Sequence, residues 1–282
     1  MESEQIIDSL KLNVHELPSG WKIKKIDDLV NEKAIYKPTD GNHGNIHPKA
    51  SDYVTSGIPF IMANGVTSGS VELRNCSFIS KVQADLLQKG FSIAGDVLLT
   101  HKGTVGNTAI VPKLETDYIM LTPQVTYYRV RDVSKILNVY IKLYFESPFF
   151  QRILKELSGG GTRAYIGITE QRNLPFILPP LPQQHKIAAT LSTWDDAIQT
   201  AEQLLNAQQE RKRGLMQQLL TGQKRLPGFS EEWHEVKAGE IFRNISIKNH
   251  PNEELCNSGS RCYPALNVRG SRGNARKRNK SL

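Results

Sequence analysis

The sequence has little cysteine and no long apolar run. Its three cysteines, Cys76, Cys256 and Cys262, are too few and too irregularly spaced for a disulfide framework or a four-ligand zinc site. Nowhere do about 18 uncharged apolar residues follow one another, as a membrane-spanning helix would require. Residues 1–5 are acidic and lack the basic and apolar parts of a secretion signal. We therefore expect free thiols, no metal, no membrane contact and a cytoplasmic location.

Signatures of independent catalysis are also missing. The chain has no Gly-Lys dipeptide, hence no phosphate-binding Walker loop, and no Asn-Pro-Pro-Tyr segment of the adenine methyltransferase type. The triplet Glu210-Arg211-Lys212 resembles half of a nuclease motif but has no Pro-Asp partner. His43 and His47 have ligand-like spacing, yet no cysteine or acidic residue beside them completes a metal site. We expect a non-catalytic chain, and an independent nuclease is the less favoured alternative.

The positive charge is concentrated at one end of the sequence. The net charge is +8, and residues 255–282 carry seven basic and no acidic residues, which leaves +1 for residues 1–254. Bulk charge is therefore no evidence that the rest of the chain binds nucleic acid. Any DNA site there must be a local patch.

Residues 1–180 have the pattern of one mixed α/β domain of the α+β class. Short β-branched and aromatic runs predict strands at three places: 59–62, 96–100 and 125–130. Helical stretches are predicted at 81–88 and 136–157, the second broken at Ser147-Pro148. Many loops rich in Gly, Pro and Asn separate these elements.

A long helix is predicted over residues 181–222. Pro179, Pro180 and Pro182 fix an extended entry, no proline follows from 183 to 221, and Gly222 suits a helix end. The proline-free stretch 183–221 is roughly 55 to 60 Å long as a helix. Eight of ten seam positions at alternating spacings of four and three are apolar, as in a coiled coil. The ten positions are Ile187, Leu191, Trp194, Ile198, Ala201, Leu205, Gln208, Lys212, Leu215 and Leu219.

A single helix cannot bury its own apolar seam. It must pack on the preceding domain or pair with a second helix, and a narrow stripe with a period of 3.5 residues favours the second arrangement. The sequence contains no other long seam of this kind. We therefore expect the partner helix to come from another chain. A surface helix lying on its own domain is the alternative.

A short repeat follows the predicted helix. When Trp233 is placed on Trp21, Lys237 falls on Lys25 and Ile241 on Leu29, and each tryptophan follows a Leu-Pro pair. We expect residues 223–254 to begin a second, truncated copy of the domain formed by residues 1–180. Residues 255–282 lack an apolar period and are expected to be a disordered basic tail, with a DNA-binding arm as the alternative.

Four motifs in this order resemble the specificity subunit of type I restriction-modification enzymes. They are the tryptophan-anchored start at 17–29, Gly95-Asp96-Val97-Leu98, the glycine-rich segment 159–162, and Leu178-Pro179-Pro180-Leu181-Pro182-Gln183-Gln184 before a long helix. The resemblance covers residues 17 to about 254. It implies a truncated form of the subunit with one recognition domain.

The resemblance also implies partners and cofactors. Family members have two recognition domains joined by two antiparallel helices, and each domain reads half of an interrupted target in double-stranded DNA. Separate modification subunits bind S-adenosylmethionine and methylate adenine, and separate restriction subunits use ATP and Mg to translocate and cut. We expect no cofactor on this chain and pairing of two copies as a homodimer, which requires an inverted target. A coiled-coil scaffold without DNA binding is the alternative.

Candidate DNA contacts lie on three polar segments. Base edges are read by Arg, Asn and Gln, and phosphates by Lys, Arg, Ser, Thr and backbone amides. Thr162 and Arg163 are the strongest single candidates, with Tyr165 able to stack on a base. The predicted contacts are Lys37, Asn42, His43 and Lys49, then His101, Lys102, Thr104 and Asn107, and last Thr162, Arg163 and Tyr165. The second group is expected on a glycine loop after a strand.

Overall fold

The computed structural model describes residues 17–67, 69–159 and 164–242. The chain divides into two compact units, Met1–Gln208 and Gln209–Leu282. The predicted tail, residues 255–282, lies outside the described residues, as do Thr162 and Arg163. None of the helices in the described ranges combines the length and the apolarity that crossing a bilayer requires.

Short strands form the sheets of the described part of the first unit. The strands are β1 (Lys22–Lys25), β2 (Thr39–Asp40), β3 (Tyr53–Val54), β4 (Ile58–Ile61), β5 (Val66–Thr67), β6 (Ser70–Val71), β7 (Ser77–Ile79), β8 (Phe91–Ser92), β9 (Val97–Lys102), β10 (Thr104–Ile110), β11 (Ile119–Leu121), β12 (Val125–Tyr128) and β13 (Pro175–Leu178). One sheet has the order β10-β9-β12-β2 and another the order β3-β7-β4-β11-β8. Two smaller sheets pair β1 with β13 and β5 with β6. The three strands predicted from apolar runs are present as β4, β9 and β12.

Alternation along β9 places its side chains in two cores. Val97 and Leu99 join the cluster formed with the helices, whereas Leu98 joins a second cluster with β4, β5 and β11. Successive strand residues point to opposite faces of a sheet, so one strand supplies both clusters. The β10-β9-β12-β2 sheet is therefore covered on both faces. This burial explains the continuous apolar run that predicted the strand.

Four short helices pack on these sheets. They are α2 (Ile26–Asn31), α3 (Lys81–Asp85), α4 (Asn138–Glu146) and α5 (Pro148–Leu157), with α6 (Ile168–Arg172) just before β13. The predicted break between α4 and α5 is confirmed. Ser147 caps α5 by accepting a hydrogen bond from the Phe150 amide, 3.2 Å away, and Pro148 occupies the first turn.

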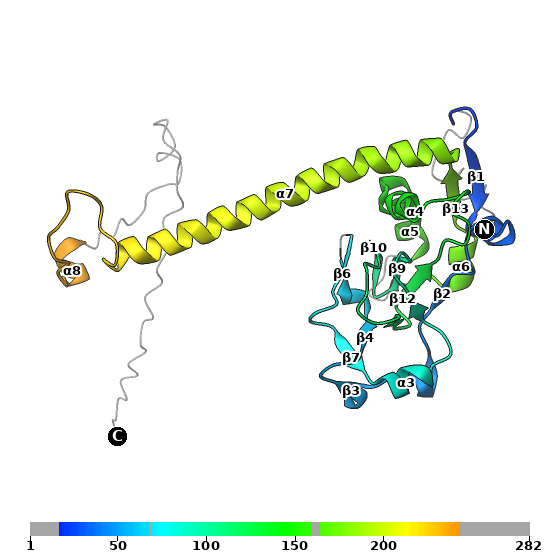
Figure 1. Ribbon diagram of the computed structural model, residues 1–282, viewed down its shortest axis with the longest axis horizontal. Helices are drawn as coiled ribbons and strands as arrows, with labels where there is room; N and C mark the ends of the chain where they lie inside the picture. The colour runs from blue at the N-terminus through cyan, green and yellow to red at the C-terminus, as the bar shows by residue number, and fades with distance from the viewer. Residues whose placement is uncertain (1–16, 68, 160–163, 243–282) are drawn as a thin grey trace, which may run out of the picture. The chain divides into compact units, whose positions relative to one another are not determined.

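The tryptophan-anchored start closes the domain where the long helix leaves it. Strand β1 pairs antiparallel with β13, so that Lys22 faces Leu178. The Trp21 indole donates a hydrogen bond to Gln183, at the start of α7 (Leu181–Leu220). Figure 1 shows α4 and α5 between the start of α7 and the sheet that contains β9 and β10. The first segment and the helix entry are thus held together.

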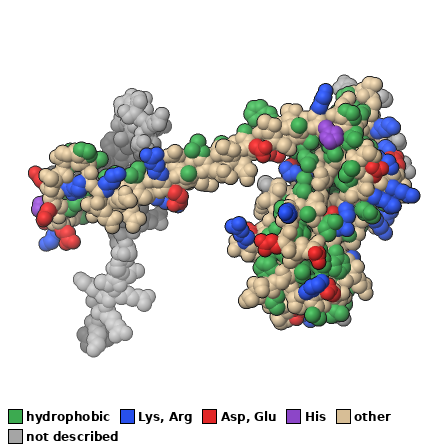
Figure 2. Space-filling view, in the orientation of Figure 1, with side chains coloured by type: hydrophobic (Ala, Val, Ile, Leu, Met, Phe, Trp, Pro, Cys, Tyr) green, Lys and Arg blue, Asp and Glu red, His purple; other side chains and the backbone are tan. Residues whose placement is uncertain are grey.

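Helix α7 confirms the predicted long helix, starting and ending close to the expected residues. Pro182 lies in its first turn, and Gly222, beyond its last residue, has a φ of +77°. Gln184 and Ala188 are buried, and most other side chains of α7 are exposed. Figure 2 shows apolar side chains at the surface along this helix. The exposed seam residues are Leu191, Trp194, Ile198, Leu205 and Leu215.

The described part of the second unit repeats the local structure of the domain start. Helix α8 (Ala238–Ile241) begins directly after Lys237, as α2 begins directly after Lys25. Trp233 lies against Gly222, and the Arg225 guanidinium lies 5.1 Å from the centre of its ring. The repeat therefore extends to the position of this short helix, although residues 234–237 form no strand like β1. That it begins a second recognition domain stays a prediction.

Candidate nucleic-acid interface

The second predicted DNA segment is a hairpin. The expectation of a glycine loop over residues 100–107 is wrong, because β9 turns at Gly103 directly into β10. Gly103 has a φ of +81°, and Gly106, with a φ of +102°, lies where the pairing register shifts between Val105 and Thr108. These glycines permit a tight turn and a bulge. The hairpin leaves Lys102 and Thr104 exposed at its tip.

His101 is buried although it lies next to the exposed tip. It is 1% exposed, and its Nδ1 donates to the Ile166 carbonyl oxygen 3.0 Å away. Burial lowers the pKa of His101, so the ring is neutral near pH 7 and its Nε2 is a hydrogen-bond acceptor. Nε2 has no partner among the described residues. The half-exposed Tyr165 covers this histidine, with ring centres 5.8 Å apart.

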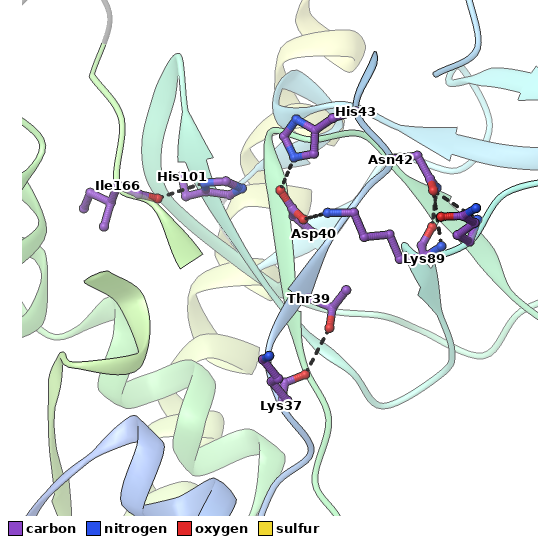
Figure 3. Close-up of polar contacts among 9 residues, drawn as sticks. Lys37, Thr39, Asp40, Asn42, His43, Lys89, His101 and Ile166 are labelled. Atoms are coloured by element: carbon purple, nitrogen blue, oxygen red, sulfur yellow. Dashed lines mark hydrogen bonds and ion pairs between the residues drawn. The ribbon is translucent and has the colours of Figure 1, made fainter. Parts of the chain in front are cut away.

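A buried carboxylate organises the first predicted segment. Asp40, on β2, is 3% exposed and lies between His43 and Lys89 (Figure 3). The His43 Nε2 is 2.7 Å from one carboxylate oxygen, and Lys89 pairs with the other. Burial raises the pKa of Asp40, but the hydrogen bonds from Lys89 and His43 outweigh it and lower that pKa overall. Asp40 is therefore charged near pH 7 and holds His43 in place.

Asn42 also holds the segment after β2 in place. It is 2% exposed, and its side-chain oxygen accepts hydrogen bonds from the backbone amides of Gln88 and Lys89, at 3.0 and 3.3 Å. Its amide nitrogen donates to the Lys89 carbonyl. Because Asn42 is buried and both ends of its amide are hydrogen-bonded to the backbone of residues 88 and 89, it has a structural role here.

His43 and Lys102, from two of the predicted segments, line one cavity of about 340 Å³, here called the hairpin cleft. Its walls come from the loop after β2, the tip of the hairpin and the connection between β11 and β12. The lining residues are His43, Gly44, His47, Tyr53, Met62, Lys102, Thr122, Pro123 and Gln124. His43 and Gln124 lie 81 residues apart in the sequence, but the fold brings them to one cavity.

Two buried polar atoms of the hairpin cleft are unsatisfied. Thr122 is 3% exposed and its hydroxyl has no hydrogen-bond partner among the described residues, and the same holds for His47 Nδ1. Burial lowers the pKa of His47, which keeps its ring neutral near pH 7. Buried polar groups in native proteins are almost always paired with protein, water or ligand. The hairpin cleft therefore offers free donors and acceptors beside the exposed ammonium of Lys102.

Gln124 has a fixed orientation in this cleft. Its side-chain oxygen accepts from the Ala63 amide at 3.2 Å, and its backbone oxygen accepts from the His101 amide at 2.9 Å. The side-chain NH₂ is then left as a donor. Sequence reasoning missed Gln124 and Thr122, since an isolated polar residue beside a proline carries no signal of its own.

The other predicted contacts do not converge on the cleft. Lys37 and Lys49 are exposed elsewhere on their segment, and the Asn107 side chain donates to the Val66 carbonyl at 2.8 Å. Thr162 and Arg163 lie outside the described residues. No group of three or more metal-ligating side chains occurs in the described ranges. As DNA contacts, these residues stay predictions.

Comparison with known proteins gives relatives over most of the chain. Residues 18–208 match the family model for the type I restriction modification DNA specificity domain. The chain is 24% identical over 264 residues to the type I restriction enzyme MjaVIII specificity subunit of Methanocaldococcus jannaschii, covering 89% of this chain and 56% of that protein. It is 23% identical over 206 residues to the EcoBI specificity subunit of Escherichia coli, covering 72% and 41%. The chain thus spans about half the length of these relatives.

A solved structure confirms the fold class. One chain of a structure described as the basis of complex assembly and conformational transition of the type I R-M system superposes with a TM-score of 0.50. The two chains are 21% identical, and the match covers 76% of this chain and 48% of the other. The mixed α+β arrangement with its long helix is shared. Because the family model matches more than half of the chain, the protein belongs to the type I restriction-modification DNA specificity domain family.

Proposed function

We propose that this chain reads half of an interrupted DNA target, without catalytic activity of its own, as the specificity part of a type I restriction-modification complex. Its partners are modification subunits, which bring S-adenosylmethionine, and restriction subunits, which bring ATP and Mg. Membership of the specificity-domain family supports this assignment. The hairpin cleft is the observation in the structure that carries it.

The chemistry of the hairpin cleft suits the edge of a base pair. Lys side chains bind guanine O6 and N7, and Gln side chains bind adenine N6 and N7 in the major groove. Lys102 and the donor end of Gln124 lie in one cavity, beside the Thr122 hydroxyl, which has no partner in the described part of the chain. Asp40 holds His43, and the Ala63 amide holds the side-chain oxygen of Gln124, so these two side chains are oriented before DNA arrives.

Pairing of two copies through α7 completes the proposal. Trp194, Ile198 and Leu205 are more than half exposed on one stripe of the helix. Antiparallel pairing of two such helices buries both stripes and carries one recognition domain at each end. The target is then an inverted repeat with a gap. The basis of this step is the exposed seam.

DNA binding by the complex with its modification subunit tests the assignment. Replacing Lys102 with alanine should weaken binding to the selected target about 5- to 100-fold, the usual value of one good base contact. Lys186→Ala, which removes an exposed lysine on α7, is the matched control. Mobility shifts or fluorescence anisotropy give both values. Equal affinities of the two variants would show that the hairpin cleft does not contact DNA. A wild-type complex with no preference among DNA sequences would instead favour a coiled-coil scaffold without DNA reading.

A further inference from the structure

A buried glutamine holds the first turns of α7 on the recognition domain. Gln184 is 0% exposed. Its side-chain nitrogen donates to the carbonyl oxygens of Lys135 and Pro179, at 3.1 and 2.9 Å, and its side-chain oxygen accepts from the Leu137 amide at 3.1 Å. Both donors of the amide are used, and the oxygen is engaged as well. The second turn of α7 is thereby fixed to the loop that precedes α4.

A second contact lies further along the same helix. Lys142, on α4, has a side chain only 15% exposed, with its ammonium 3.0 Å from Glu146 and 3.5 Å from Asp195 on α7. Gly69, at the turn between β5 and β6, packs on this lysine, because a Cβ there would come within 3.4 Å of its Cε and Nζ. Lys142 is thus held from two sides while it faces α7.

Two separated contacts fix a direction, whereas one contact allows a pivot. Asp195 lies eleven residues beyond Gln184, a distance of about 16 Å along the helix axis. The 25 residues from 196 to 220 are about 37 Å long, so a tilt of about 10° moves their end by about 6 Å. One base pair advances about 3.4 Å along DNA. A tilt of this size therefore displaces the end of α7 by more than the length of one base pair, which would change the separation of the half-sites.

We propose that Gln184 and Lys142 are positioning residues that set the gap between the two half-sites of the target. They do so by fixing the direction in which α7 leaves the recognition domain, and neither touches DNA. The inference rests on the proposed function, since a gap exists only if two paired chains read one target. Under this proposal, the hairpin cleft selects the bases of each half-site, whereas Gln184 and Lys142 set the gap between the half-sites.

The test uses duplexes that carry two wild-type half-sites separated by gaps of every length around the preferred one. The complex with the modification subunit is allowed to select among them, and bound DNA is sequenced. For Lys142→Ala, the preference for the best gap over its neighbours should fall about three- to fivefold, the scale of a partly exposed ion pair. For Gln184→Ala, the preference should fall about tenfold or more, because three hydrogen bonds are lost. The half-site bases should not change in either variant.

Matched controls come from the same helix. Gln203→Ala and Lys186→Ala remove exposed side chains of the same types and should keep the wild-type gap. If Gln184→Ala does not fold, the positioning role is tested by exchanging the charges of the second contact, with Lys142→Glu and Asp195→Lys made singly and together. Each single exchange should broaden the range of accepted gaps, and the double exchange should narrow it again in part, because Glu146 stays beside residue 142. A merely damaged fold would show no such recovery.

The outcomes separate the two proposals. If the single charge exchanges retain the wild-type gap, the positioning role is wrong while half-site reading stands. If the wild-type complex enriches no pair of half-sites, the proposed function itself fails.

Discussion

Two stretches of α7 carry the same apolar stripe but meet different surroundings. At its start, Ile187 of the stripe packs against the domain core, beside Gln184 and Ala188, which are 0% and 8% exposed. From Trp194 onward the stripe is open, with Trp194 66% and Leu205 58% exposed. The period of the sequence is continuous across both stretches. A partner surface, and not the pattern, therefore decides which part of the stripe is buried.

In a chain without a partner, the open stretch exposes apolar side chains to water, which costs free energy. Exposed apolar side chains in a row mark interaction surfaces, and each large one gains about 1.5–3 kcal/mol when fully buried. The covered stretch packs on the domain, and the proposed pairing of two copies would bury the open stretch. Four variants would break or sharpen this contrast.

The largest effect is expected at the centre of the open stretch. Leu205→Asp would place a charge in the paired seam of both chains, so the dimer dissociation constant should rise by at least about 1000-fold. The unfolding of the separate chain should be unchanged, because residue 205 contacts solvent there. Sedimentation gives the first value and denaturant titration the second. Gln203→Asp carries the same charge on another face of α7, and a comparable loss of dimer in that control would show that the seam is not the interface.

A smaller effect is expected at the buried ion pair of the covered domain. The Asp96 side chain is 1% exposed, and Arg129 binds both of its oxygens at 2.8 Å. Asp96→Asn leaves a partly buried guanidinium without its charge partner and should lower the free energy of unfolding by about 3–5 kcal/mol. Urea unfolding measures this. A loss below about 1 kcal/mol would mean that the pair is as accessible to water as the pairs on α7.

Acid should weaken the covered domain through Asp40. Its pKa is lowered in the folded protein, so its stabilisation is complete above the unfolded pKa, near 4, and is lost as pH falls through the folded value. Asp40→Asn should therefore cost about 1–3 kcal/mol at pH 7 and progressively less below about pH 4. Unfolding curves from pH 7 to pH 3 give the difference. The exposed Asp196→Asn is the control, and a cost for Asp40→Asn that does not shrink in acid would contradict the assignment.

The smallest effect is expected at an ion pair in the open stretch. Glu210 and Arg213 are 2.6 Å apart, but their side chains are 70% and 74% exposed. Glu210→Gln should change the free energy of unfolding by less than about 0.5 kcal/mol. A cost near that of Asp96→Asn would show that this part of α7 is covered in solution.

Elements set by local sequence could be predicted, and contacts across the chain could not. The break at Ser147-Pro148 and the long helix follow from prolines and apolar period, and both are present. The loop expected after β9 is a hairpin, because a glycine bulge keeps the chain in the sheet. His101 and Asn42 are polar residues in segments of loop composition. Only partners 65 and 46 residues away, at Ile166 and Gln88, bury them.

The bases selected from random duplex DNA by the complex with the modification subunit test the central claim most directly. Reading by two chains paired through α7 predicts an inverted repeat of one half-site with a fixed gap. A single unrepeated motif would contradict the pairing. No enriched sequence at all would contradict the proposal that the chain reads DNA.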